Sequence, residues 1–213
     1  MAITLYSDGF YISPYVFSVF IVLEEKAIPY RLERVPLQDK AHERPEYRDR
    51  AITGRVPAID HDGFWLAESA AIDNYLEDAF PAPHHRRALP ENIRDRARAR
   101  MVLDWIRSDL LPIREERPTH TMFYERAKAP LSTVGEAAHK RLVDVATRLV
   151  PDGATSLFGE WSIADTDLAF MLQRLVLNGH EIPARLRAFA DAQWSRPSVR
   201  KWIALPRAPY VPY

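Results

Sequence analysis

The stretch GRVPAIDHDGFWLAESAAIDNYLEDAF, residues 54 to 80, carries the clearest structural signals in the chain. Asp62 and Gly63 separate two short apolar runs, a pattern typical of a tight antiparallel β-hairpin. Ser69 follows the second run and can start a helix. The positions that then recur at helical spacing are Ala70, Ala71, Tyr75, Leu76 and Ala79. The stretch therefore predicts strand, turn, strand and helix.

The residues before this stretch predict a strand, a buried helix and a second strand. Ile3 to Tyr6 form a short apolar run that ends at a turn formed by Asp8 and Gly9. Residues 15 to 23 contain a single polar side chain, and a run of this length is far too short to span a bilayer, which needs about 20 residues. The polar residues Glu24, Glu25 and Lys26 are expected to give this helix a solvated end.

Residues 30 to 37 alternate in polarity, as an edge strand does, and residues 41 to 50 are polar and predict an irregular or briefly helical segment. This order predicts a small mixed sheet with helices packed on it, an α/β domain over residues 1 to 80. Residues 81 to 91 are rich in proline and charge, which is typical of a linker, and the adjacent His84 and His85 are expected to be exposed there.

The remainder, residues 92 to 213, predicts an all-helical domain, because periodic apolar positions recur between proline and glycine breaks. The expected helical segments are residues 92 to 115, 132 to 149, 163 to 178, 183 to 194 and 197 to 205.

Composition narrows the classes of function. The 29 basic and 29 acidic residues cancel, so no overall field favours nucleic acid or a membrane surface, and a small molecule or a protein is the expected partner. The absence of cysteine excludes disulfides, zinc–cysteine sites and a protein thiolate nucleophile. The seven histidines form no metal-like cluster, so no metal is expected. The first residues do not resemble a secretory signal, which predicts a cytoplasmic protein.

Four short motifs are candidates for function, and each also has a structural explanation. Ser13-Pro14 is a favoured helix start, with serine as the N-cap and proline at the first helical position. A proline such as that of Val56-Pro57 is tolerated where a strand begins. Glu68-Ser69 can be an acidic residue and a cap at a helix start. Ser162 and Asp165 have the spacing of a reciprocal capping box, so we assign them to folding.

The three N-terminal motifs, in this order and followed by a helical half, resemble the glutathione S-transferase superfamily. The strings RSDLLPIREERPT, residues 107 to 119, and LFGEWSIADTDLA, residues 157 to 169, are similar to the bacterial YfcF-type glutathione transferases. The resemblance implies a thioredoxin-like N-terminal domain that binds glutathione, an all-α C-terminal domain that contributes the site for an electrophile, and a homodimer.

The resemblance also implies roles for single residues. Ser13 would donate a hydrogen bond to the glutathione sulfur, with Tyr6 and Tyr11 as rivals because other branches of the superfamily use a tyrosine. Val56-Pro57 would be a cis bond that turns the backbone of Val56 toward the cysteinyl part of glutathione. The remaining implied glutathione contacts are Glu68 and Ser69 for the γ-glutamyl carboxylate, and Lys40 or His42 for the glycyl carboxylate.

The expected reaction is attack by the glutathione thiolate on an apolar electrophile, with glutathione-linked reduction of a peroxide as the second possibility. Trp105 and Asp109 share a helix face and, with Tyr11, are candidates for the electrophile site. Core packing and surface charge are the alternative explanation of that pair. A noncatalytic binding module is the alternative for the whole chain, since one fold can serve several functions.

Overall fold

The computed structural model describes residues 2–212, which divide into two compact units. Unit 1 comprises residues 2–88 together with 201–212, and unit 2 comprises residues 89–200. The strands are β1 (Ile3–Asp8), β2 (Tyr30–Val35), β3 (Ala58–His61) and β4 (Phe64–Ala67). The helices are α1 (Pro14–Glu25), α2 (Pro45–Ala51), α3 (Ser69–Ala79), α4 (Ile93–Asp109), α5 (Leu111–Glu116), α6 (His120–Phe123), α7 (Thr133–Leu149), α8 (Ile163–Leu177), α9 (Ala184–Trp194) and α10 (Pro197–Ile203), with the short 3-10 turns η1 (Leu37–Asp39) and η2 (Ala41–Glu43).

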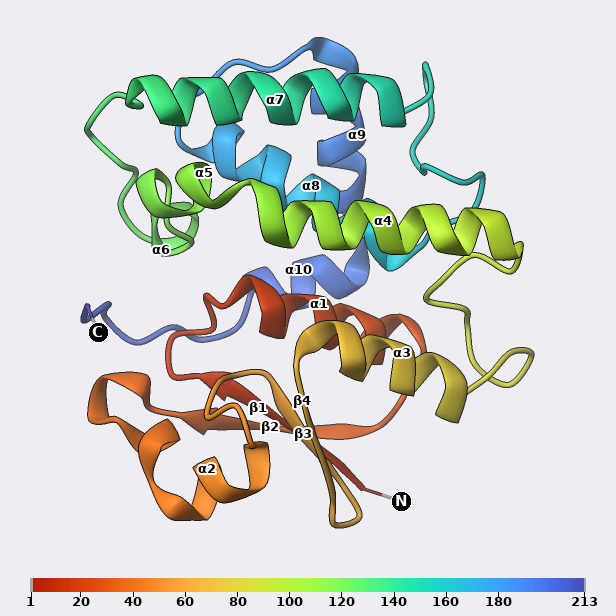
Figure 1. The fold of residues 1–213 in the computed structure, drawn as a ribbon, viewed down its shortest axis with the longest axis vertical. Helices are drawn as coiled ribbons and strands as arrows, with labels where there is room; N and C mark the ends of the chain where they lie inside the picture. The colour runs from red at the N-terminus through yellow and green to blue at the C-terminus, as the bar shows by residue number, and fades with distance from the viewer. Residues whose placement is uncertain (1, 213) are drawn as a thin grey trace. The chain divides into compact units, whose positions relative to one another are not determined.

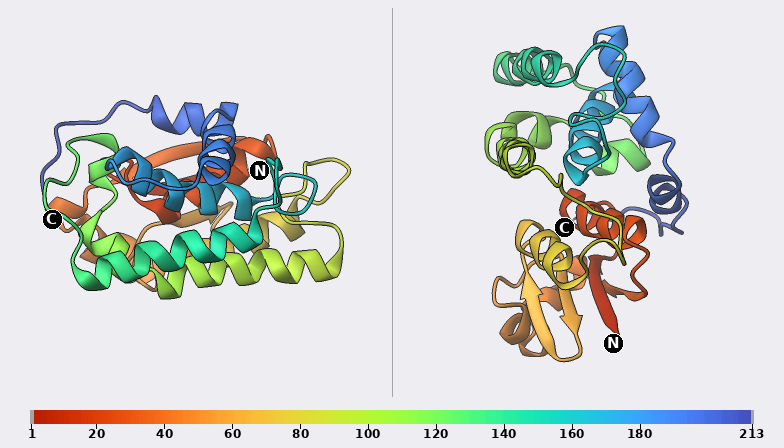
Figure 2. Two further views of the ribbon diagram at one scale, coloured as in Figure 1. Left: turned by 90° about the horizontal axis from the view of Figure 1, so that it is seen from above. Right: turned by 90° about the vertical axis from the view of Figure 1, so that its right-hand side faces the viewer.

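Unit 1 contains a four-stranded mixed sheet in the order β2-β1-β3-β4. β1 runs parallel to β2 and antiparallel to β3, and β3 and β4 form the predicted hairpin. Asp62 and Gly63 both have positive φ, at 50° and 90°, as a two-residue hairpin turn requires. α1 and α3 cover one face of the sheet and α2 covers the other (Figures 1 and 2). This is the predicted thioredoxin-like arrangement, with β2 as the expected edge strand.

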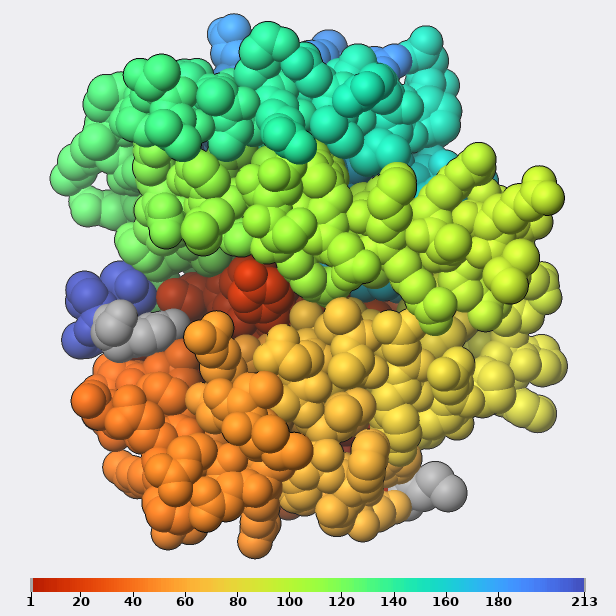
Figure 3. All heavy atoms as spheres, viewed as in Figure 1, coloured from red at the N-terminus to blue at the C-terminus, as the bar shows by residue number. Residues whose placement is uncertain are grey.

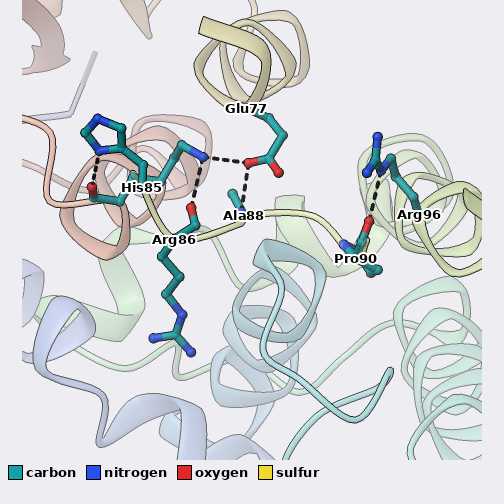
Figure 4. Close-up of polar contacts among 7 residues, drawn as sticks. Glu77, His85, Arg86, Ala88, Pro90 and Arg96 are labelled. Carbon is teal, nitrogen blue, oxygen red and sulfur yellow. Dashed lines mark hydrogen bonds and ion pairs between the residues drawn. The ribbon is translucent and has the colours of Figure 1, made fainter. Parts of the chain in front are cut away.

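The end of α1 corrects one expectation, because Lys26 is buried rather than solvated. Its side chain is completely inaccessible, and its Nζ donates to Glu77 Oε2 at 2.7 Å and to the Arg86 carbonyl at 2.9 Å. Ala88 N–H donates to the same Glu77 oxygen at 2.9 Å, and His85 Nδ1 donates to the Lys26 carbonyl at 2.8 Å. Figure 4 shows Glu77, Arg86 and Ala88 gathered in this network. His85, expected to be exposed, is therefore half-buried and bonded.

The buried face of α3 also differs from the predicted one. Ala71 and Ala79 are exposed. The side chains that face the interior are Ser69, Ile72, Asp73, Leu76 and Glu77. A prediction from apolar positions does not find Asp73 and Glu77, because both are carboxylates. Both have buried partners: Ser18 Oγ donates to Asp73 Oδ2 at 3.1 Å, and Glu77 pairs with Lys26.

The division into units places the last residues of the chain with the N-terminal domain, whereas the sequence predicted them in the helical domain. The reason is packing: the buried ring of Trp202 lies edge-on against Phe17 and Phe20 of α1, with centroid distances of 5.8 Å and 5.2 Å. Residues 81–88, predicted as linker, also belong to unit 1, because the Lys26 network binds them.

Unit 2 is all-helical, as predicted, with α8 at its centre. Nearly every residue of α8 from Ile163 to Leu175 is buried, which is typical of a helix surrounded by others. α4, α6, α7 and α9 all contact it. α4 and α7 run antiparallel to each other and form much of the outer surface of this unit in the view of Figure 3.

Candidate functional site

The strand register brings the three N-terminal motifs to one end of the sheet. Tyr6 pairs with Ala58, so the residues after β1 lie beside those before β3. Ala58 in turn pairs with Ala67, which places Val56-Pro57 beside Glu68 and Ser69. α1 and α3 both begin at this end, so two helix N-termini, each favouring a nearby anion, lie there.

Ser13 is the N-cap of α1 and Pro14 its first residue, as the sequence predicted. Ser13 has extended backbone angles (φ −62°, ψ 120°), and its Oγ accepts a hydrogen bond from Val16 N–H at 3.3 Å. The side chain is half-buried. A hydroxyl that accepts in this way keeps its own hydrogen for donation to a second group.

Asp8, which the sequence predicts only as part of a turn, has contacts that were not predicted. Its buried carboxylate accepts hydrogen bonds from the loop that leads to α1. Oδ1 accepts from Phe10 N–H and Ile12 N–H, both at 3.0 Å, and Oδ2 accepts from Ile12 N–H at 3.2 Å and Ser13 N–H at 2.9 Å. A polar residue that ends a buried strand just before a tight loop is the signal that points to such a contact.

The Val56–Pro57 bond is cis, as predicted. Tyr47 of α2 supports the segment before it, since its hydroxyl donates to the Arg55 carbonyl at 2.7 Å. On the neighbouring strand, Glu68 has a positive φ of 70° and ψ of 115°, an uncommon conformation for a residue other than glycine. Ser69 is thereby the first residue of α3 instead of its cap, and it is buried.

Lys40 and His42 follow β2 at the same end of the sheet, because β2 is parallel to β1 and Val35 pairs with Asp8. The Lys40 side chain is 74% exposed, with its Nζ 3.9 Å from Glu43 Oε2. His42 is half-buried, and its Nε2 lies 3.8 Å from Glu43 Oε1. The structure places both residues near the other candidates without giving either a defined ligand geometry.

Family comparisons agree with this arrangement. A model of the glutathione S-transferase N-terminal domain matches residues 12–79, and a model of the C-terminal domain of the same family matches residues 92–208. The chain belongs to the glutathione S-transferase family.

Individual members support the assignment. A crystal structure of a glutathione transferase homologue from Burkholderia, with bound glutathione, is 37% identical, has a TM-score of 0.80, and covers 95% of this chain and 97% of its own. The crystal structure of glutathione transferase Omega 3C from Trametes versicolor is 25% identical and has a TM-score of 0.73. The match covers 94% of this chain and 88% of that protein. A probable maleylacetoacetate isomerase 2 from Drosophila melanogaster is 35% identical over 45% of this chain. The chain spans only 41% of that relative's length.

The two rival tyrosines of this glutathione S-transferase chain have other contacts. Tyr6 stacks on Trp65 with a centroid distance of 4.8 Å and meets Tyr47 edge-on at 5.7 Å, on the α2 face of the sheet. Burial raises the pKa of Tyr6, with the negative charge of Asp60 as the next cause. Tyr11 is buried, has a φ of 52°, and its hydroxyl accepts from Arg34 Nε at 2.8 Å.

In unit 2, Trp105 Nε1 donates to Asp109 Oδ2 at 2.9 Å, so the expected pair on one helix face is formed. Arg141 of α7 binds the same oxygen through its Nε at 2.5 Å. Trp105 and Asp109 are half-buried, and the Arg141 contact links α4 to α7.

Ser162 and Asp165 form the predicted capping box at the start of α8. Asp165 Oδ2 accepts from Ser162 N–H, and Oδ1 accepts from Leu157 N–H, both at 2.6 Å. Burial nevertheless raises the pKa of Asp165 to about 6, because desolvation outweighs these hydrogen bonds.

Between residues 2 and 212, no group of three or more His, Asp or Glu side chains is arranged to hold a metal ion. No helix in the same range combines the length and the hydropathy that crossing a bilayer requires.

Proposed function

We propose that the chain is a glutathione transferase, in which unit 1 binds glutathione and activates its thiolate for attack on an electrophilic or peroxide substrate. The observation that carries the proposal is the convergence of Ser13, Val56-Pro57 and Glu68-Ser69 at one end of the sheet, through the strand register. The glutathione bound to the Burkholderia homologue supports it, since that protein is similar over nearly its whole length.

In this proposal glutathione is bound through its cysteinyl backbone and through the carboxylates at its two ends. The N–H and C=O of Val56 pair with the cysteinyl backbone, a mode that recognises a peptide without side-chain contacts. Glu68 and Ser69, with the start of α3, bind the γ-glutamyl end, because a helix N-terminus favours a carboxylate. Lys40 or His42 binds the glycyl carboxylate.

Ser13 acts on the sulfur as a hydrogen-bond donor. A thiol with a pKa near 8.5 is only a few per cent ionised at pH 7. A reduction of about two units in the thiol pKa makes the thiolate the major form and corresponds to roughly 2.7 kcal/mol of differential stabilisation. A serine hydroxyl is not ionised at neutral pH and therefore cannot take the thiol proton as a base. Its hydrogen stabilises the thiolate instead, by a hydrogen bond to the sulfur. The start of α1 supports it.

The geometry favours Ser13 over the tyrosines. The Tyr6 ring is enclosed between Trp65 and Tyr47, and its raised pKa makes its phenol a poorer donor. Tyr11 is buried, with its hydroxyl against the Arg34 side chain of β2. Ser13 is half-buried, stands at the start of α1, and has its hydroxyl hydrogen available.

In the chemical step the thiolate sulfur forms a bond to the electrophilic carbon, and the leaving group departs with its electron pair. Trp105 and Asp109 of unit 2, with Tyr11, remain proposed contacts for this second substrate.

We also propose that the chain is of the YfcF type within the family, because residues 107 to 119 and 157 to 169 resemble that type. We further propose that the protein is a homodimer in the cytoplasm. Largely exposed apolar side chains such as Ile52 (86%) and Ile93 (79%) are available to a second copy.

Retention on immobilised glutathione, followed by turnover assays, tests the proposed function. We expect elution by free glutathione and turnover of an aryl halide or an organic hydroperoxide. Retention without turnover of either substrate would favour a noncatalytic binding module. A protein that is not retained and has no activity would contradict the proposal as a whole.

A further inference from the structure

Asp8 is a buried acid that is not among the proposed glutathione contacts. It lies at the end of β1 with no accessible surface, and no basic side chain among the described residues forms an ion pair with it. A carboxylate is expensive to bury unless hydrogen bonds replace its hydration. Three backbone N–H groups do so here, and all three belong to the loop that carries Ser13.

The dependence is mutual, because the loop needs an acceptor at this point. Phe10 and Ile12 are buried, and buried N–H groups in folded proteins are almost always paired with an acceptor. Tyr11 between them has a left-handed φ of 52°, which a residue with a side chain adopts only when its surroundings enforce it. The Asp8 carboxylate, by binding the N–H groups on both sides of Tyr11, holds the loop in this conformation.

Ser13 is fixed from two directions. On the loop side its N–H donates to Asp8 Oδ2 at 2.9 Å. On the helix side its carbonyl accepts from Phe17 N–H at 3.0 Å, while its Oγ accepts from Val16 N–H at 3.3 Å. These contacts set the direction of the Cα–Cβ bond and leave the hydroxyl hydrogen as the group that can point away from the helix.

We propose that Asp8 is a positioning residue, which orients the Ser13 hydroxyl toward the thiol through the Ser13 N–H. The inference rests on the proposed function and deepens it: Asp8 acts through Ser13 and does not itself contact glutathione. Preorganised donors are effective because they need no reorganisation when charge develops, and small misplacements are costly.

The charge of Asp8 and its positioning role shift the thiol pKa in opposite directions, so a substitution can separate the two effects. A nearby carboxylate disfavours a second negative charge, and its neutralisation alone would lower the thiol pKa. Loss of the orientation of Ser13 would raise it. Asp8→Asn has nearly the same shape but presents one oxygen and one NH₂ group, so at least one loop N–H loses its acceptor.

The test is the thiol pKa of bound glutathione, measured by thiolate absorbance against pH in wild type and Asp8→Asn. We expect the pKa to rise toward the free value and kcat to fall roughly 10- to 100-fold, with little change in KM. Asp60→Asn is the matched control, since Asp60 Oδ1 accepts from Gly63 N–H at 2.7 Å in the hairpin, and this variant should leave the thiol pKa unchanged. In a Ser13→Gly background, Asp8→Asn should no longer raise the pKa.

An unchanged or lower thiol pKa in Asp8→Asn would overturn the inference, as would an equal rise in the Ser13→Gly background. If Asp8→Asn does not fold, hydrogen exchange of the wild-type protein decides. The Ser13 and Ile12 amides should exchange more slowly than that of Tyr15, and equal rates would overturn the inference. A wild-type complex whose thiol titrates at its free value would instead contradict the proposed function.

Discussion

At the scale of the residue, the Ser13 hydroxyl can hold two roles at once, because it has lone pairs that accept and a hydrogen that donates. Acceptance from Val16 N–H caps α1, and donation serves the proposed thiolate. Helix capping and thiol activation are therefore compatible in a single side chain. A substitution must remove one role while sparing the other to tell them apart.

Ser69 provides a test of glutathione binding. Ser69→Ala should raise KM for glutathione about tenfold or more with little change in kcat, because a hydrogen bond to a charged group stabilises ground and transition states about equally. Steady-state kinetics at varied glutathione concentration measures both constants. Ser132→Ala, at the start of α7, is the matched control and should leave KM unchanged. If saturation by glutathione is the same in Ser69→Ala and wild type, Ser69 does not bind the γ-glutamyl end.

Asp165 predicts a pH dependence of stability. Its folded-state pKa of about 6 lies above the value of 3.8 usual for the side chain, so the folded protein holds the proton more tightly than the unfolded chain. The contribution of this group is therefore complete below about pH 3.8 and is lost as the pH rises through 6. Urea unfolding at pH 5 and pH 7.5 should show wild type losing more free energy of unfolding than Asp165→Asn. Equal losses would show that Asp165 does not titrate in this way.

At the scale of the element, the Lys26–Glu77 pair joins the end of α1 to α3 and to residues 86–88. Lys26→Met should lower the free energy of unfolding by about 3 to 5 kcal/mol, because it leaves the Glu77 carboxylate buried beside Ala88 N–H without its cation. Chemical denaturation measures the effect.

The control for this pair is the double variant Lys26→Met/Glu77→Leu, since apolar replacement of a whole buried pair is often neutral. It should recover much of the stability lost in Lys26→Met. A double variant that is less stable than Lys26→Met would mean that the hydrogen bonds to Arg86 and Ala88 matter more than the charge pair.

Elements whose signals are local could be predicted, and contacts between distant residues could not. The hairpin at Asp62-Gly63 and the cap at Ser13 follow from backbone preferences of neighbouring residues. The partner of Lys26 is 51 positions away on α3. The end of α1 is polar, as solvent-exposed helix ends are, so the sequence pattern wrongly predicts that Lys26 is solvated. Asp8 was missed because its partners are backbone N–H groups, and only its place at the end of a buried strand, before a tight loop, points to them.

At the scale of the whole molecule, the strand register brings the proposed site residues to one end of the sheet, as their motifs suggest, whereas the packing of the last residues of the chain has no such signal in the sequence. Val56-Pro57 and Glu68-Ser69 flank the hairpin symmetrically, so the prediction of the hairpin also brings them together. The return of Trp202 and Arg207 to unit 1 depends on tertiary packing: Arg207 donates to the Tyr11 carbonyl at 3.1 Å, across 196 positions.

The proposed homodimer predicts a mass about twice that of the 24.5 kDa chain. Multi-angle light scattering at micromolar concentration measures it, with a dilution series to detect dissociation. The expected reason is that the exposed apolar side chains of a single chain lose water contact on association. A single species of 24.5 kDa across the series would contradict the prediction.

The most direct test of the central claim is the pH titration of the thiolate absorbance of glutathione bound to wild type and to Ser13→Gly. Glycine is a tolerable N-cap, so this variant should lose only a few tenths of a kcal/mol in stability and should still bind glutathione. We predict a thiol pKa well below its free value in wild type and a return toward that value in Ser13→Gly. A thiol pKa that stays equally low in Ser13→Gly, or one that is not lowered in wild type, would contradict the activation of glutathione by Ser13.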